Sequence, residues 1–292
     1  MTSGKVYVLG ATGGVGTPVV KELLEKGIST TILVRDPSKA HKLFGENDNL
    51  TVIKGDYTDF DAFKNSIGGH ERLFLLVRDI DGMPKIKIAF SKIGYEAGVK
   101  QVVDVSSGSV SGSWRQNVVT AAHYYSEKGI YELPNRGYYV ALRPTAFFTN
   151  HFFGDDKTIR FKGIITGAQE LDSKSAWISP NDIAHLAVNI LTEPVEQHAD
   201  MVYDMTSQRL SGNERATIIS RVLGKDVKYV QVPFEQAYKN FIDFAHLPHS
   251  MAYGILDGDA GIFNVNQGLS TVLHREPETL EQWLTSNKDA FA

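Results

Sequence analysis

Short apolar segments alternate with helical patterns along the first half of the chain. The apolar segments are rich in β-branched residues, or run without polar interruption as in 73–77. Such segments are typical of strands that are covered on both faces of a parallel sheet. The predicted strands are 6–9, 30–34, 50–54, 72–77, 101–105 and 138–142, and the predicted helices are 18–26, 60–67, 84–97 and 118–133. Strands separated by helices of this length form βαβ units, so we expect an α/β fold with a doubly wound parallel sheet.

The pattern changes after Pro144. Glycine-rich connections and isolated helices follow, and 181–191 is a helical segment with one apolar face. The segment 203–205 is a candidate for a further strand of the same sheet. The expected division is a core at 1–150 and a smaller, interleaved α+β lobe at 151–292, with part of 175–206 returning to the core.

Composition narrows the classes of function. The chain has no cysteine, which excludes disulfides, thiolate metal ligands and thiol nucleophiles. Its formal net charge is −4 and its basic residues are scattered, so no surface for nucleic acid is indicated. No apolar run approaches the ~20 residues that span a bilayer, and residues 1–4 lead into the first strand without a signal segment. We expect a cytoplasmic monomer or homodimer with no membrane or nucleic-acid partner.

Three glycines lie between the first predicted strand and the first predicted helix. Gly10, Gly13 and Gly16 have the spacing G-x-x-G-x-x-G. The first permits a tight turn, the second allows backbone N–H groups to approach a pyrophosphate, and the third lets the helix pack against the strand. The N-terminus of the helix then faces the phosphates with its partial positive charge. In this context the motif predicts a dinucleotide-binding Rossmann fold.

The end of the second predicted strand bears on the choice of cofactor. NAD-binding proteins tend to place Asp or Glu there, about 20 residues past the glycines, to bind the ribose 2′-hydroxyl. This chain has Arg35 instead, and a guanidinium matches a 2′-phosphate in a bidentate manner. Ser38 and Lys39 are candidates for further contacts, whereas Asp36 is the residue that favours NAD. We expect NADP(H).

The chain resembles the NmrA-like group of atypical short-chain dehydrogenases/reductases, whose members include quinone-reductase-like and isoflavone-reductase-like proteins. The segments that carry the resemblance are 8–16 (VLGATGGVG), 33–39 (LVRDPSK), 54–57 (KGDY), 105–107 (VSS), 142–144 (LRP) and 177–184 (WISPNDIA). The glycine loop and Arg35 are the specific elements, and the other segments support them collectively.

The resemblance implies a set of cofactor-binding residues. The pyrophosphate would be held by Gly10, Thr12, Gly13, Gly14 and Val15, and the 2′-phosphate by Arg35. The adenine would lie near Asp56 and Tyr57, and the nicotinamide half near Leu76, Val77 and Ser106. Ligands bound at these positions would lie beyond the carboxyl ends of the strands, as is general for open α/β sheets.

Tyr124 and Lys128 have the Tyr-x-x-x-Lys spacing, which places them on one face of a helix. In the main branch of the dehydrogenases, the lysine lowers the pKa of the phenol and binds the nicotinamide ribose. The phenol then exchanges a proton with the substrate oxygen during hydride transfer. Ser106 or Ser107, at the end of the preceding strand, would orient the substrate carbonyl. His123 leaves a second register open, because NmrA-like proteins commonly have a histidine a few residues before a lysine or glutamate.

The segment that follows the last core strand holds two further features. Phe147 and Phe148 belong to a phenylalanine cluster that would either form the floor of an apolar substrate pocket or pack between the lobes. The spacing of His151 and Asp155 fits no known set of metal ligands, so we expect a solvated loop there and no metal site.

Two classes of function fit these observations. The first is an NADPH-dependent oxidoreductase that reduces a small apolar or aromatic carbonyl, enone, quinone or imine, with the C-terminal lobe selecting this small-molecule substrate. The alternative is a non-catalytic NADP(H)-binding redox sensor that regulates a partner protein. The fold alone does not decide between them.

Overall fold

The computed structural model describes residues 4–112, 115–153, 155–257 and 263–291, which form two compact units. Each unit is assembled from three segments of the chain. Unit 1 comprises Met1–Val110, Thr120–Arg143 and Ile183–Asp204, and unit 2 comprises Ser111–Val119, Pro144–Asp182 and Met205–Ala292. Across the described ranges, every helix is too short or too polar to cross a membrane.

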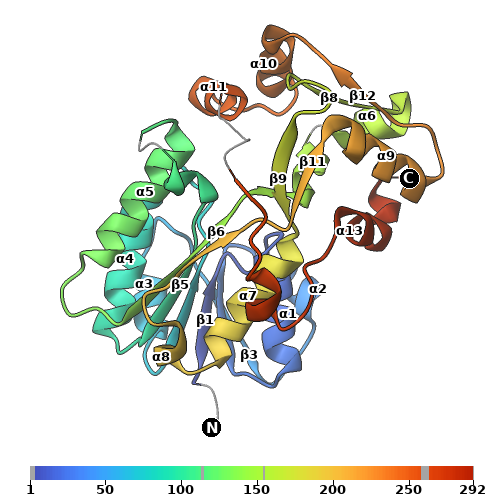
Figure 1. The fold of residues 1–292 in the computed structure, drawn as a ribbon. Helices are drawn as coiled ribbons and strands as arrows, with labels where there is room; N and C mark the ends of the chain where they lie inside the picture. Colours follow the sequence, from blue (N-terminus) through green and yellow to red (C-terminus); the bar gives the residue numbers. More distant parts are fainter. Residues whose placement is uncertain (1–3, 113–114, 154, 258–262, 292) are drawn as a thin grey trace. The chain divides into compact units, whose positions relative to one another are not determined.

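Unit 1 is built on a seven-stranded sheet of order β10-β6-β5-β4-β1-β2-β3 (Figure 1). The strands are β1 (Val6–Leu9), β2 (Thr30–Val34), β3 (Leu50–Lys54), β4 (Arg72–Leu75), β5 (Gln101–Val105), β6 (Tyr138–Pro144) and β10 (Val202–Met205). Strands β1 to β6 pair in parallel. The strand order reverses between β1 and β4, and open sheets of this kind bind ligands at such a switch point. The predicted doubly wound Rossmann fold is therefore confirmed.

Helices cover both faces of this sheet (Figure 1). One face carries α3 (Asp61–Ser66), α4 (Met83–Glu96) and α5 (Val118–Tyr131), and the other carries α1 (Gly16–Glu25) and α7 (Pro180–Thr192). The remaining helices near the sheet are α2 (Pro37–Phe44), α8 (Val195–His198) and the 3₁₀ turn η1 (Gly108–Ser111).

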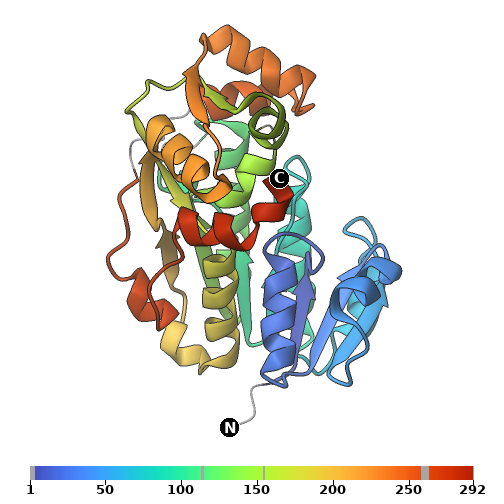
Figure 2. The ribbon, with the colours of Figure 1, turned by 90° about the vertical axis from the view of Figure 1, so that its right-hand side faces the viewer.

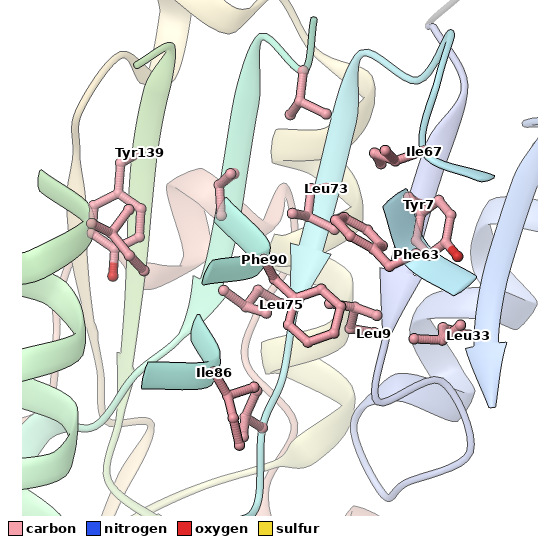
Figure 3. Packing of buried hydrophobic residues seen from close by; sticks show 14 of the residues in the cluster. Tyr7, Leu9, Leu33, Phe63, Ile67, Leu73, Leu75, Ile86, Phe90 and Tyr139 are labelled. Carbon is pink, nitrogen blue, oxygen red and sulfur yellow. The ribbon is translucent and has the colours of Figure 1, made fainter. Parts of the chain in front are cut away.

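Aromatic and aliphatic side chains fill the space between the sheet and α3 and α4. The ring of Phe63 lies 4.9 Å from that of Tyr7 and 4.7 Å from that of Phe90, both in edge-on contacts. Figure 3 shows these rings gathered over Leu9 and Leu75 of the central strands. Each such side chain contributes about 1.5–3 kcal/mol when it is buried. This packing fixes the central strands whose ends form the candidate site.

The C-terminal half contributes α7 and β10 to unit 1. In both views α7 lies beside α1, where His185 Nδ1 is 2.8 Å from Glu22 Oε1 (Figures 1 and 2). The segment before β10 runs alongside β6, and the N–H of Ala141 donates to the carbonyl of Met201 at 3.1 Å. The distal part of the chain thus completes the sheet of unit 1.

Unit 2 contains a three-stranded sheet, β11-β9-β7, and a two-stranded sheet, β12-β8. Its strands are β7 (Ala146–Phe147), β8 (Ile164–Gly167), β9 (Lys174–Ile178), β11 (Gln208–Ser211) and β12 (Lys228–Gln231). Its helices are α6 (Asp155–Lys162), α9 (Gly212–Leu223), α10 (Phe234–Asp243), α11 (His249–Asp257), α12 (Leu269–Leu273) and α13 (Leu280–Ser286), with 3₁₀ turns η2 (Phe148–Phe153) and η4 (Lys288–Phe291). A capping box of Ser211 and Glu214 starts α9, and Gly224 ends it with a φ of 68°.

Two local differences from the sequence-based expectations have physical causes. Helix α2 was not expected, because Asp36 and Pro37 suggest a turn as readily as a helix start. In the structure the Asp36 carboxylate accepts hydrogen bonds from the N–H groups of Ser38 and Lys39, and Pro37 opens the helix. Strand β4 ends two residues early, and the carbonyl of Leu76 accepts a hydrogen bond from the Tyr57 hydroxyl.

Candidate active site

The glycine turn between β1 and α1 has a backbone that only glycine accommodates at two positions. Gly10 has a φ of +80°, and a Cβ there would lie 2.6 Å from the carbonyl oxygen of Leu76. A Cβ on Gly16 would lie 2.1 Å from the carbonyl oxygen of Gly10. Gly14, by contrast, has no atom within 4 Å of the position of a Cβ. The turn is therefore packed tightly against the sheet and open on the side of Gly14.

The N-terminus of α1 is free to bind an anion. Val15 occupies the N-cap position without a side-chain hydrogen bond, and the first turn carries no acidic residue. The first N–H groups of a helix lack intrahelical partners and carry partial positive charge. Thr12 and Gly13 are half-buried beside this helix end, and the Thr17 N–H donates to the carbonyl of Gly13 at 2.9 Å. This arrangement suits a pyrophosphate.

Arg35 and Lys39 are both exposed, on either side of the start of α2. Asp36 lies between them, and its carboxylate is engaged as the N-cap of that helix at 2.9 and 3.2 Å. One oxygen of Asp36, the residue that favours NAD, is thus used to cap the helix. No carboxylate in the described part of the chain forms an ion pair with Arg35, which leaves its guanidinium available to a ligand.

Tyr57 connects the end of β3 to the end of β4. Its hydroxyl donates to the carbonyl of Leu76 at 2.9 Å, and burial raises the pKa of Tyr57 to about 12. The cationic side chains of Arg35 and Arg78 lie close enough to lower that pKa in part. The neighbouring Asp56 accepts hydrogen bonds from the N–H and hydroxyl of Thr58, at 3.0 and 3.2 Å.

These contacts bring together the ends of β1, β2, β3 and β4. Leu76 is half-buried against Gly10, and Val77, the next residue, is buried. Arg78 is exposed and was not singled out from the sequence; its position directly after an apolar strand is the signal that would have found it. A second cation therefore lies near Tyr57.

Ser106, at the end of β5, belongs to a buried hydrogen-bonded network. Its hydroxyl donates to Glu127 Oε1, and its N–H donates to the carbonyl of Leu142 at 2.7 Å. Arg143 holds the same carboxylate through Nε–Oε1 at 2.9 Å and Nη2–Oε2 at 2.5 Å. Because the Ser106 proton is donated to Glu127, its oxygen lone pairs remain for another donor.

A fully buried ion pair lies beneath Ser106. Lys87 Nζ is 2.7 Å from Asp104 Oδ1, with neither side chain exposed, and it also donates to the carbonyl of Val105 at 2.9 Å. Tyr139 donates its hydroxyl proton to Asp104 Oδ2 at 2.9 Å. Burial raises the pKa of Asp104, whereas Lys87 and the hydrogen bond from Tyr139 lower it. These contacts fix the backbone directly before Ser106.

The two registers that the sequence leaves open differ in burial on α5. His123 and Glu127 are buried and lie four residues apart, whereas Lys128 is exposed and forms an ion pair with Glu132. Tyr124 is half-buried and contacts the ring of Tyr125 at 5.5 Å between centroids. The structure does not bring Lys128 to the Ser106 network. The buried pair at this spacing is His123 and Glu127.

The surroundings of His123 disfavour its charged form. Burial lowers its pKa well below the ordinary value, and the nearby Lys87 lowers it further. Its Nδ1 has no hydrogen-bond partner among the described residues. The other buried residues of α5 include Ala122, Ser126 and Ile130, which are small or apolar. Their positions in the sequence are the observation that could have identified the buried face with His123 and Glu127.

The segment after β6 lies in unit 2. Phe147 is half-buried, but Phe148 is fully buried in the core of this unit, 6.0 Å from the ring of Trp283. Phe148 therefore packs within unit 2, which argues against an open pocket at this side chain. The expectation of a solvated loop at His151 was wrong: the imidazole is buried in η2, and its Nδ1 is 2.9 Å from Asp155 Oδ2.

Comparison with known proteins gives a consistent result. The model of the NmrA-like family matches residues 2–284. An NAD(P)H azoreductase from Xenophilus azovorans is 29% identical over 248 residues, which cover 85% of this chain and 83% of the relative. The NADPH complex of an Escherichia coli quinone oxidoreductase superposes with a TM-score of 0.80 at 23% identity, covering 97% of this chain and 99% of that one. The negative transcriptional regulator NmrA in complex with NAD has a TM-score of 0.72 at 15% identity, with coverages of 98% and 95%. Because the family model matches nearly the whole length of this chain, the chain belongs to the NmrA-like family.

Proposed function

We propose that the protein is an NADPH-dependent oxidoreductase that reduces a small apolar or aromatic carbonyl, enone, quinone or imine. The observation that carries the proposal is the glycine turn, where Gly10 and Gly16 admit no side chain and the N-terminus of α1 has no internal cap. A dinucleotide pyrophosphate fits this turn. The azoreductase relative, whose name includes NAD(P)H, supports the same class of reaction.

The preference for NADPH over NADH rests on the start of α2. Arg35 is exposed there, with Lys39 one helical turn away, and the Asp36 carboxylate is bound to backbone N–H groups. The Oδ1 atom of this carboxylate caps the helix, whereas the guanidinium of Arg35 matches a phosphate in a bidentate manner. In the proposal, Arg35 and Lys39 bind the 2′-phosphate, and Asp56 and Tyr57 lie near the adenine.

The chemical step uses residues at the ends of β4 and β5. Bound NADPH supplies a hydride, and Leu76 and Val77 exclude water from the nicotinamide half. Ser106, held by Glu127, presents oxygen lone pairs and so positions a neighbouring N–H or O–H group. The proton for the substrate comes from Tyr124 or from water. The assignment of Lys128 to the ribose has less support, since Glu132 already binds its ammonium.

The first test is the oxidation of NADPH by the purified protein with a panel of quinones, enones, aldehydes and imines. Turnover is expected, and it identifies the substrate class. In parallel, Tyr124→Phe distinguishes the two proton sources: a lost rate assigns Tyr124, and a retained rate assigns water. No turnover across the panel, together with tight NADPH binding, would overturn the enzyme proposal.

A redox sensor remains the second candidate, and one observation favours it. The buried register of α5 carries Glu127 where the main-branch dehydrogenases have lysine, and Arg143 and Ser106 occupy that carboxylate. A protein without the lysine that activates a phenol is suited to binding a dinucleotide without turnover. A sensor is expected to discriminate between NADPH and NADP⁺ in binding, and to capture or release a partner protein accordingly.

A further inference from the structure

Three side chains from separate elements of unit 2 form a stacked cluster. His151 of η2 lies parallel to Trp177 of β9, with ring centroids 5.0 Å apart and an interplanar angle of 11°. The guanidinium of Arg215, in the first turn of α9, lies 4.8 Å from the centroid of the same indole and 6.0 Å from that of Tyr229. Cations bind favourably over such rings. The cluster is thus fixed by ring contacts with the indole of Trp177.

Each member of this cluster has a buried nitrogen without a hydrogen-bond partner among the described residues. These atoms are His151 Nε2, Trp177 Nε1 and Arg215 Nε. Buried polar groups are almost always hydrogen-bonded in folded proteins, and an unpaired one is costly. The other imidazole nitrogen, His151 Nδ1, is satisfied by Asp155 Oδ2 at 2.9 Å. Three unsatisfied nitrogens in one cluster indicate a missing partner.

Arg215 has no ion-pair partner among the side chains that the structure describes. Two other arginines of unit 2 have carboxylate partners: Arg221 contacts Glu281 at 3.0 Å, and Arg275 contacts Asp182 at 2.7 Å. The acid that faces Arg215, Asp155, is engaged with His151. Burial lowers the pKa of Arg215, and the charge of Asp155 opposes this effect.

Water alone is an incomplete partner for this cluster. A buried water satisfies hydrogen bonds, but it does not neutralise a partly buried cation. An oxyanion does both, because it accepts from the guanidinium and from the indole N–H. With Nδ1–H donated to Asp155, the His151 Nε2 accepts a hydrogen bond from a water or from a hydroxyl of the ligand.

We propose that Arg215 and Trp177 form a binding site in unit 2 for the carboxylate or sulfonate group of a small organic molecule. All residues of this site belong to unit 2, and the proposal does not depend on the proposed oxidoreductase activity.

The test is equilibrium binding of benzenesulfonate and benzoate to the full chain by calorimetry, with benzenesulfonamide as the neutral control. Wild type is expected to bind the two anions saturably and the neutral analogue at least tenfold more weakly. Arg215→Met is expected to lose tenfold or more in affinity, because a charge-assisted hydrogen bond is removed, and Arg215→Lys is expected to retain part of it. The matched control is Arg221→Met on the same helix, whose arginine is paired with Glu281 and which should bind as wild type does.

Trp177→Phe gives a second measurement if Arg215→Met fails to fold, as judged by circular dichroism. It keeps a ring under the guanidinium and removes the indole N–H, so anion affinity should fall several-fold. The absence of saturable anion binding by wild type, or equal affinity in Arg215→Met and Arg221→Met, would overturn the proposal. NADPH binding measured in the same variants is expected to be unchanged, which separates this result from the test of the dinucleotide site.

Discussion

Removing the charge of Lys87 tests the claim that a buried ion pair fixes the backbone before Ser106. The change Lys87→Met keeps most of the side-chain volume and leaves Asp104 without its cation. Both side chains are fully buried, and the ammonium also donates to the carbonyl of Val105. Breaking such a pair from one side costs about 3–5 kcal/mol, because a buried charge is left uncompensated. This is a large share of the roughly 5–15 kcal/mol that stabilises a typical domain.

The measurement is urea unfolding followed by circular dichroism, with Lys92→Met as the control. Lys92 lies on the same helix and pairs with Glu96, but both side chains are more than half exposed. That pair is expected to contribute about 0.5 kcal/mol or less. The double variant Lys87→Met with Asp104→Asn should recover part of the loss, because it removes the orphaned charge as well.

The effect of pH has a definite sign. Without Lys87, the hydrogen bond from Tyr139 still lowers the pKa of Asp104 but the cation no longer does, so burial raises this pKa further and the folded variant holds a proton that the unfolded chain releases. The loss of stability is therefore smallest in acid and grows as the pH rises through that pKa. A cost for Lys87→Met no greater than that for Lys92→Met, or a cost independent of pH, would show that the buried pair does not stabilise this part of the sheet.

Three further predictions follow from the site. Arg35→Ala should weaken NADPH binding tenfold or more and NADH binding much less, as measured by fluorescence titration; equal losses contradict the 2′-phosphate assignment. Gly16→Ala should destabilise the fold by about 1–3 kcal/mol and weaken NADPH binding, because its Cβ meets backbone 2.1 Å away, whereas Gly14→Ala should leave stability within about 1 kcal/mol of wild type. Burial keeps the pKa of His123 low, so its contribution to stability is present above about pH 6.5 and is lost as the pH falls. His123→Gln should flatten the decline of the urea midpoint below pH 6.5, and an unchanged slope argues against a buried neutral imidazole.

The sheet of unit 1 was predictable because its strands carry continuous apolar runs. Strands such as β1 and β5 are buried along their whole length, so their hydrophobic pattern has a single interpretation. Helix α2 was missed because its start depends on Asp36, and aspartate is common both in turns and at helix N-caps. The prediction extended β4 two residues too far. The carbonyl of Leu76 accepts a hydrogen bond from the Tyr57 hydroxyl, and a tertiary contact of this kind cannot be read from the local sequence.

The candidate site was predictable only where the backbone itself demands a residue type. Gly10 and Gly16 are required by conformation and close approach, so spacing alone identifies them. Spacing alone could not decide which face of α5 is directed at the site. Tyr124 and Lys128 are four residues apart, and so are His123 and Glu127. Burial separates the two pairs, and burial depends on how the helix is rotated against the sheet.

The interleaving of segments in unit 1 has a consequence for synthesis on the ribosome. The edge strand β10 joins the sheet some sixty residues after β6, its neighbour, so the sheet is incomplete until Asp204 has emerged. Until then, one side of β6 exposes unpaired backbone groups, which is a known hazard for aggregation. A nascent chain arrested before residue 200 should therefore recruit holdase chaperones more than one arrested after residue 240. The order of translation, and not only the final contacts, then bears on the yield of this fold.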